Sequence, residues 1–426
     1  MAASVHHRVF CSVTRMRVTI EVLPDSVRCC AASVIADLHN HYPMHLVPEA
    51  HGSLLELVTT ARGRWRLLDQ VQARAVGVAS RIANYQSFHS GPRSTVPLMR
   101  AGGVGVALSV LYSPFDEMDA DRRYHHPPSD AYIHSVLRHL DEVEEEIAEH
   151  HAGEATVAHN PGELDDALSA GRVALVHCLE GGFHLGLSPQ AVERAVGELA
   201  DRGIAYVTVA HLFWRRVATH ANAIPFLPDP VFYFLFPQPA IGLSDLARAA
   251  MRAMVRRRVL IDVSHMSERS LEDAFGLLDD LDSDHAVPVV ASHAAYRFGR
   301  QEYNLSERTV KRIAERDGVI GLILAEHQAT DGLRGRRTAT LGQSLEVLFR
   351  HVDRLREITG SHRHAAIGSD HDGFIKPTLA GLENAAQLGR VETALAHHYG
   401  DAAAEQIASG NVLRLLRGYW RGGSSG

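Results

Sequence analysis

Short runs of apolar, β-branched residues alternate along the chain with longer segments whose apolar residues recur every three or four positions. The short runs predict buried β-strands, and the longer segments predict amphipathic helices. Strands are expected at residues 33–37, 104–110, 172–177, 205–210, 259–264, 287–292, 319–324 and 364–368. Because these runs are almost entirely apolar, they are typical of a parallel sheet that is covered on both faces.

The segments between these strands carry helix signals. Residues 130–150 place apolar side chains on one stripe and a run of glutamates on the other. A helix over residues 188–202 is expected to begin at Ser188, which is followed by a proline suited to the first turn. A helix over residues 244–258 is expected to begin at Ser244 and to end in arginines, which suit the negative end of the helix dipole.

The succession of strands and helices predicts the fold class. Strands that are each followed by a helix or a helix-bearing connection favour an α/β fold, a (β/α)8 TIM-type barrel. Such a barrel needs about 250 residues, and the chain has 426, so we expect large loop insertions at residues 44–96, 113–161 and 225–242. An open, doubly wound sheet is the alternative. It predicts a glycine-rich phosphate loop after the first strand, where the chain instead reads DLHNHYP.

The domain organisation follows from the lack of breaks in this pattern. The chain has no internal repeat and no Pro/Gly/Ser linker long enough to separate two domains, so we predict one domain over residues 31–420. Residues 1–30 fit the alternation poorly and are predicted to be an N-terminal extension, with Met16 as an alternative start. Residues 421–426 contain GGSSG and are predicted to be a flexible tail.

The composition disfavours several classes of partner. A formal net charge of −7 argues against nucleic acid. No stretch approaches the about 18 apolar residues of a membrane span, so no membrane contact is expected. The 4 cysteines are too few for a disulfide framework, and we expect a reduced, cytoplasmic location. The unusual feature is histidine, which accounts for 28 of the 426 residues.

Polar residues that can bind a metal ion directly follow the predicted strands. They are His39, His41, Glu180, His211, His265, His293 and Asp370. The carboxyl ends of barrel strands converge at one rim, so these distant residues are expected to share one small space. Several histidines combined with carboxylates favour a transition-metal site.

Each of these motifs also has a simple structural explanation when it is taken alone. The HxH pair His39 and His41 can chelate one ion from the same side of a strand, but such pairs also arise by chance in a histidine-rich chain. The Ser-His pairs at His265 and His293 can be capping features, and Glu180 can be a solvated carboxylate in a turn. The joint arrangement is what favours a metal site.

The same motifs resemble those of a known family. DLHNHYP, LVHCLEGG, VTVAH, GLSDLARAAMRAMVRRRVLIDVSHMS, VVASHAAY, YNLSERTVKRIAERDGVIGLIL and AIGSDHDG occur in the order and spacing of the membrane (renal) dipeptidase family. Members of this family are dinuclear zinc peptidases of the amidohydrolase superfamily. The resemblance extends over residues 33–417 and is strongest between residues 242 and 373.

The resemblance implies a role for each site residue. It implies that His39 and His41 bind the first of two zinc ions per chain, that Glu180 bridges both ions, and that His265 and His293 bind the second. His211 would contact the substrate and stabilise the oxyanion, and Asp370 would be the catalytic acid/base. A hydroxide shared by the two metals would attack the amide carbonyl.

Two positions depart from the family pattern. His41 stands where the family usually has an aspartate, so a neutral ligand replaces an anionic one and the first metal should be more electrophilic. The pair Tyr303-Asn304 stands where the family has Arg-Asn, and that arginine is associated with the substrate carboxylate. A tyrosine cannot replace the guanidinium fork, but Arg297 or Arg300 could supply it from nearby.

Three functions remain open from the sequence. The first is a zinc dipeptidase that acts on small peptides, and the second is a dinuclear hydrolase for N-acyl amino acids, lactams or lactones. The third is a metal-binding protein without turnover. The apolar segment at residues 225–239 is explained by a lid over the site, by a contact in a homodimer or, slightly better, by a proline-rich loop packed against the barrel.

Overall fold

The computed structural model describes residues 34–46, 91–117, 126–224, 227–333, 337–373 and 377–422. Within these residues the strands form a single sheet in which every pairing between strands is parallel. The strands are β1 (Ile35–Asn40), β2 (Val104–Leu111), β3 (Ala155–Val157), β4 (Val173–Glu180), β5 (Tyr206–Thr208), β6 (Leu260–Asp262), β7 (Val289–Ala294), β8 (Val319–Leu322) and β9 (Ala365–Ile367). All the predicted strands are therefore present, with ends displaced by a few residues.

The sheet closes into a barrel. The strand order is β2-β1-β9-β8-β7-β6-β5-β4-β3, and an additional pairing between β2 and β4 closes the sheet and leaves β3 outside the closure. Ala174 of β4 has Val106 of β2 and Thr156 of β3 as partners, so β2 and β3 lie on opposite sides of β4. The remaining eight strands form the (β/α)8 barrel that the sequence predicts, and β3 is an addition that we did not expect. It is only three residues long and partly exposed, so it lacks a continuous apolar run.

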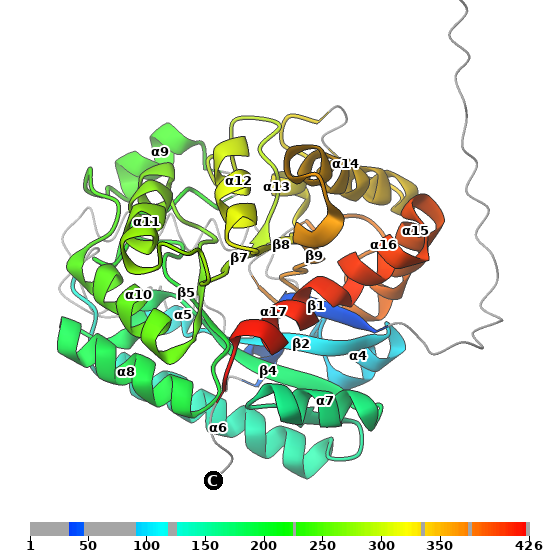
Figure 1. The fold of residues 1–426 in the computed structure, drawn as a ribbon, viewed down its shortest axis with the longest axis horizontal. Helices are drawn as coiled ribbons and strands as arrows, with labels where there is room; N and C mark the ends of the chain where they lie inside the picture. Colours follow the sequence, from blue (N-terminus) through cyan, green and yellow to red (C-terminus); the bar gives the residue numbers. More distant parts are fainter. Residues whose placement is uncertain are drawn as a thin grey trace, which may run out of the picture. The chain divides into compact units, whose positions relative to one another are not determined.

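Helices lie around the outside of these strands (Figure 1). They are α4 (Val96–Ala101), α5 (Pro114–Glu117), α6 (Tyr132–His150), α7 (Pro161–Ser169), α8 (Pro189–Asp201), α9 (Asp229–Leu235), α10 (Asp245–Arg257), α11 (Glu268–Leu281), α12 (Glu307–Glu315), α13 (Glu326–Ala329), α14 (Leu341–Thr359), α15 (Gly389–Tyr399), α16 (Asp401–Glu405) and α17 (Asn411–Tyr419). The described residues also form a π-helical turn at Gln406–Gly410 and short 3-10 turns at Tyr42–His45, Gly182–Leu185, His362–His364 and Ala385–Gln387.

The helix starts that the sequence predicts are confirmed by their capping bonds. The Ser188 side chain accepts a hydrogen bond from the Ala191 amide at the start of α8, and the Ser244 side chain accepts one from the Ala247 amide at the start of α10. Each bond satisfies an amide that has no partner within its own helix. These caps fix where the chain leaves the barrel rim and turns back along its outer face.

The predicted insertions differ in how far the structure describes them. Residues 47–90, most of the first insertion, lie outside the described residues. The second insertion contains α5, α6 and β3, and the third contains α9. The predicted extension at residues 1–30 and the end of the predicted tail, residues 423–426, also lie outside the described residues. The described residues, which begin at Val34, belong to one compact unit. The division into domains therefore stays a prediction.

A small apolar cluster lies apart from the main core. Phe232 and Phe236, from α9 and its C-terminal end, pack with Leu212 and Phe213, which directly follow His211. Phe234 on the same helix is 80% exposed. The predicted apolar segment is thus a helix packed beside the strand end that carries His211. No helix in the described part of the chain has both the length and the apolar character needed to span a bilayer.

One buried histidine outside the barrel rim should destabilise the fold. His177 of β4 is buried, and neither of its ring nitrogens has a hydrogen-bond partner. Burial lowers the pKa of His177 to about 3. We expect His177→Leu to raise the free energy of unfolding by about 1–3 kcal/mol, because it removes a buried polar group that is left unsatisfied. Urea titration of both proteins at pH 8 would measure the gain.

The pH dependence of that gain provides a second measurement. Below about pH 6.5 the unfolded chain binds a proton at His177 that the folded protein does not bind, so wild-type stability falls as the pH drops. The gain from His177→Leu should therefore be larger at pH 5 than at pH 8. His351 is the matched control, because it is also buried but accepts a bond from the Tyr296 amide and bonds the Ala329 carbonyl. His351→Leu should lower stability, and a gain there too would contradict this explanation.

Candidate metal centre

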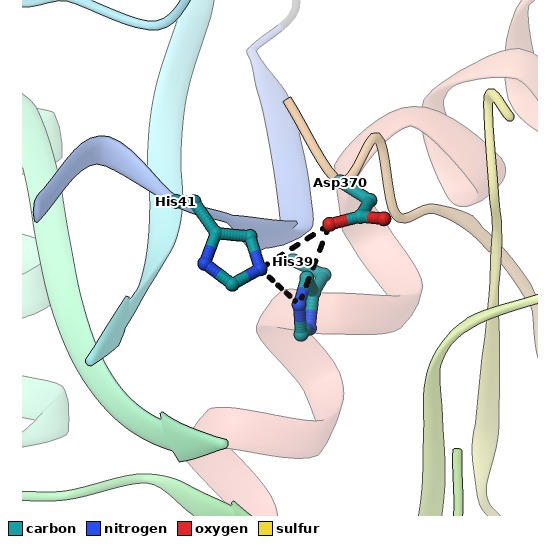
Figure 2. Close-up of side chains that lie close together, drawn as sticks. All are labelled: His39, His41 and Asp370. Carbon is teal, nitrogen blue, oxygen red and sulfur yellow. Dashed lines mark hydrogen bonds and ion pairs between the residues drawn. The ribbon is translucent and has the colours of Figure 1, made fainter. Parts of the chain in front are cut away.

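The metal-competent residues predicted to share one site, including the substrate contact His211 and the acid/base Asp370, all meet at the carboxyl ends of the barrel strands. They are His39 in β1 and His41 directly after it, Glu180 at the end of β4, His211 after β5, His265 after β6, His293 in β7 and Asp370 after β9. All of them are buried. Figure 2 shows His39, His41 and Asp370 pointing toward one another, with His39 coming from β1, His41 from the residue after it and Asp370 from the segment after β9.

The first pair of histidines shares its space with Asp370. The Nε2 atoms of His39 and His41 are 3.1 Å apart. Asp370 Oδ1 lies 3.2 Å from His41 Nε2 and 3.9 Å from His39 Nε2. These three side chains form one of the groups whose donor atoms lie close enough together to hold a metal ion.

The second pair consists of His265 and His293, and Glu180 lies between the two pairs. The Nε2 atoms of His265 and His293 are 2.9 Å apart, and Glu180 Oε1 is 3.5 Å from each. The same Oε1 atom is 3.4 Å from His39 Nε2, while Oε2 is 3.3 Å from His41 Nε2. One carboxylate is therefore in reach of all four imidazoles.

These donors fit a pair of metal ions. A tetrahedral zinc ion with ligand bonds of about 2.0–2.1 Å holds its donor atoms about 3.3 Å apart, which matches the separations around Glu180. Glu180 Oε1 is buried and has no hydrogen-bond partner. At these distances the facing nitrogens of each pair either share a hydrogen, as one donor and one acceptor, or direct both electron pairs at a cation between them. The donor set and its spacing are thus those of a metal centre.

The pKa values of the first-pair residues suit the same interpretation. Burial lowers the pKa of His39 well below the usual range of a histidine, which keeps its nitrogen free to bind metal. Burial would raise the pKa of Glu180, but the imidazoles of His211 and His39 outweigh it and lower the pKa well below its usual range. Burial would lower the pKa of His41, but its hydrogen bonds to Asp370 and Glu180 raise it to about 9. A metal bound by His41 would have to displace that proton.

His211 is held by a carboxylate that the sequence did not reveal. The Oε2 atom of Glu117, in α5, lies 2.7 Å from His211 Nδ1. The Tyr112 hydroxyl and the Phe213 amide donate hydrogen bonds to the same carboxylate, at 2.7 and 3.0 Å. The other ring nitrogen of His211 is 3.2 Å from Glu180 Oε2. Burial would lower the pKa of His211, but Glu180 and Glu117 raise it to about 10. Glu117 lies in a predicted insertion, where no strand end marked it as a site residue.

Asp370 has a strained backbone, which is a common feature of functional residues. Its φ is 57°, in the left-handed region that non-glycine residues rarely adopt, and His265 shares this feature with a φ of 65°. A Cβ at Gly373 would lie 1.9 Å from Asp370 Oδ1, so a larger residue there would displace the Asp370 carboxylate. Burial raises the pKa of Asp370. A buried carboxyl group with a raised pKa is a candidate for acid/base chemistry.

The residues predicted to bind substrate do not all reach this centre. Tyr303 does: its ring lies edge-on to His265 with the centroids 5.0 Å apart, and its hydroxyl donates to the His293 carbonyl at 2.8 Å. Asn304 is buried beneath it and donates to the Gln328 carbonyl.

The two arginines proposed as carboxylate binders lie in other surroundings. Arg297 donates through Nε and Nη2 to the carbonyls of Asn304 and Glu302, both at 2.7 Å, and its Nη1 lies 2.6 Å from Glu268 Oε1. Arg300 is exposed, and its backbone amide bonds Asp331. Arg297 therefore holds its own loop together and links it to α11, and its role as a carboxylate binder stays a prediction.

Two buried aspartates behind the metal centre were not predicted to take part in it. Asp262 at the end of β6 accepts hydrogen bonds from the amide and hydroxyl of Ser264 and from those of Ser292, the residues that precede His265 and His293. Asp37 of β1 accepts bonds in the same way from the amide and hydroxyl of Ser369, which precedes Asp370. An aspartate inside an apolar strand was the available signal in the sequence.

Comparison with known proteins places the chain in a family. Residues 26–419 match the family described as membrane dipeptidase (Peptidase family M19). The chain belongs to this family. The resemblance seen in the sequence is thereby confirmed over nearly the whole chain.

The relatives are distant. A dipeptidase tcpJ of Claviceps purpurea is 26% identical over 320 residues, and an uncharacterized dipeptidase C965.12 of Schizosaccharomyces pombe is 29% identical over 261 residues. These alignments cover 75% and 59% of the chain, but only 66% and 55% of the relatives' own length.

Solved structures of dipeptidases share the fold. The crystal structure of dipeptidase AC has a TM-score of 0.64 at 21% identity and covers 91% of this chain and 99% of its own. A metallopeptidase of Rhodobacter sphaeroides liganded with a phosphinate mimic of the dipeptide L-Ala-D-Ala has the same TM-score at 20% identity, covering 91% of this chain and 100% of its own.

Proposed function

We propose that this protein is a zinc-dependent hydrolase that cleaves the amide bond of dipeptides or related small amides. The observation that carries the proposal is the position of Glu180, a buried carboxylate without a hydrogen bond at Oε1, between two histidine pairs whose nitrogens face each other. Membership in the membrane dipeptidase family supports the same reaction. His39, His41, Glu180, His265 and His293 would hold two zinc ions.

Zinc bound at this position would lower the pKa of a coordinated water and polarise the amide carbonyl. His211 would donate a hydrogen bond from Nε2 to the oxygen on which negative charge develops, while Glu117 holds its other nitrogen. Asp370 would take the proton of the attacking water at its carboxylate and deliver it to the leaving amine. Both groups are buried, so bulk water competes little for these bonds.

The partners that we propose are small molecules. A peptide or amide substrate suits a centre that is buried at the end of a barrel. Nucleic acid and membrane binding are not part of the proposal, and a homodimer through the segment at residues 225–239 stays a prediction.

The test combines metal analysis with a substrate screen. We expect about two zinc ions per chain after gentle purification, and hydrolysis of at least some L,L- or L,D-dipeptides. L-Ala-D-Ala is the first compound to test, because the Rhodobacter sphaeroides metallopeptidase binds a mimic of it. Less than one zinc ion per chain, or two ions without hydrolysis of any dipeptide or N-acyl amino acid, would contradict the proposal.

A second class of substrate is favoured by one observation. Tyr303 stands at the position where the family resemblance calls for arginine, and its hydroxyl already donates to the His293 carbonyl. The Arg297 guanidinium likewise donates to carbonyls of its own loop. Lactams, lactones or other small amides without a free carboxylate at that place would need no guanidinium.

Arg297→Ala distinguishes the two substrate classes. If Arg297 reorients to bind the substrate carboxylate, the variant should lose about 1.5–3 kcal/mol of binding, seen as a KM raised by tenfold or more for dipeptides but unchanged for a lactone or an uncharged amide. Arg300→Ala is the matched control, since that side chain is exposed and in the same loop. Equal losses on charged and uncharged substrates would assign Arg297 to loop structure only.

A further inference from the structure

The hydroxyl of Ser292 contacts one histidine from each pair of the metal centre. Its Oγ lies 2.9 Å from Nδ1 of His39 and 2.8 Å from Nδ1 of His293. The two rings lie against each other with their centroids 3.7 Å apart. A single buried hydroxyl therefore touches the outward-facing nitrogens of two imidazoles whose other nitrogens point at Glu180.

Asp262 determines how this hydroxyl is oriented. Ser292 Oγ donates its one proton to Asp262 Oδ2 at 2.6 Å, and the Ser292 amide donates to Oδ1 at 2.9 Å. With its proton committed, the hydroxyl can only accept from the two rings. Both His39 and His293 must then carry their hydrogen on Nδ1, which leaves a free electron pair on each Nε2, the atom that would bind metal.

A second hydroxyl, that of Tyr206, supports the placement of the hydrogen on Nδ1 of His39. The Tyr206 hydroxyl donates to the Leu38 carbonyl at 3.1 Å, so at 2.9 Å from His39 Nδ1 it is also an acceptor for that ring. Among the described residues, Ser292 is the only one that forms a hydrogen bond with His293 Nδ1. His39 thus has two supports and His293 has one.

We infer that Ser292, oriented by Asp262, is a positioning residue shared by the two metal-binding pairs, so that one hydroxyl prepares both for an ion. This inference rests on the metal centre of the proposed function. It explains why the two Ser-His motifs, for which capping was the alternative explanation from the sequence, converge on one aspartate. It also assigns Asp262 a role other than ligand, although it falls in a group with His39 and His293 that could hold an ion.

The test compares Ser292→Ala with Ser264→Ala by zinc affinity. Ser264 is the matched control, because its hydroxyl donates to the same Asp262 at 2.8 Å but bonds no ring nitrogen. Stepwise dissociation constants are measured by competition with a chromophoric chelator, and cobalt(II) absorption spectra report the ligand geometry. Ser292→Ala should raise both constants, one by about 10–100-fold and the other less, since Tyr206 still supports His39. Ser264→Ala should change neither by more than about threefold.

The double variant Ser292→Ala with Tyr206→Phe extends the comparison. It removes both supports of His39, so the constant that changed less should also rise by about 10–100-fold. Thermal melting checks that each variant is folded. If Ser292→Ala does not fold, Asp262→Asn is used instead, because its amide can no longer take the Ser292 proton at the same place and should weaken both sites.

The outcomes separate this inference from the proposed function. Wild-type protein that binds fewer than two ions would overturn the dinuclear centre and the inference with it. Two ions in the wild type, together with unchanged constants in Ser292→Ala, would overturn the inference only. A change in only one constant, or an equal effect of Ser264→Ala, would also overturn it, because the hydroxyl would then not be shared.

Discussion

Glu180→Gln should reduce the bound zinc from about two ions per chain to one or fewer and lower hydrolysis by about a thousandfold or more. Glu180 is within 3.5 Å of the Nε2 atoms of all four ligand imidazoles, two from each pair. A glutamine has the same size but no charge, so two cations would be held close together without the anion between them. The loss should therefore appear first in the metal content and only as a consequence in the rate.

The measurement is the zinc content of the folded protein after dialysis, followed by dipeptide hydrolysis at saturating zinc. Glu117→Gln is the matched control, because that carboxylate is also buried at the rim but bonds His211 and not the metal-binding histidines. It should keep its zinc. Retention of two tightly bound ions by Glu180→Gln would show that this carboxylate does not bridge them.

Asp370→Asn should lower kcat by about 10²–10⁴-fold while most of the zinc is retained. Asparagine keeps the shape of the side chain and one oxygen near His41, but it cannot accept and return a proton. The left-handed backbone at this position, with a φ of 57°, is also one that asparagine tolerates. The fold and the first histidine pair should thus survive, and the loss should be confined to the chemical step.

Zinc content, kcat and KM are measured together on this variant. Asp372→Asn is its control: two residues further along the same turn, Asp372 also has a positive φ of 63°, but it accepts hydrogen bonds from the amides of Arg93 and Ser94. That variant should change stability more than kcat. A kcat for Asp370→Asn within a few-fold of the wild type would assign the proton transfer to another group.

The barrel could be predicted because its signals are local. The apolar run of each strand and the caps at Ser188 and Ser244 depend on neighbouring residues, and all of these predictions are confirmed. β3 was missed because three partly exposed residues make no such run. Its position is set by pairing with β4, a contact that the sequence pattern does not contain.

The supporting residues of the centre could not be predicted in the same way. Glu117 reaches His211 from a short helix that is 94 residues earlier in the chain. Ser292 meets His39 across 253 residues. Neither contact leaves a periodic signal, because it depends on which strands are adjacent and on how the loops return to the rim.

The sequence by itself determined the order of the barrel strands and the candidate set of metal-binding side chains, because strand ends and polar residues can be located from local pattern. Only the tertiary structure decided that Glu180 lies between two histidine pairs, that Arg297 is bound within its own loop, and that one serine hydroxyl serves two imidazoles. The reason is physical: donor atoms about 3 Å apart must be placed to within a fraction of an ångström. That precision comes from the closed barrel and its register, which depend on contacts throughout the chain.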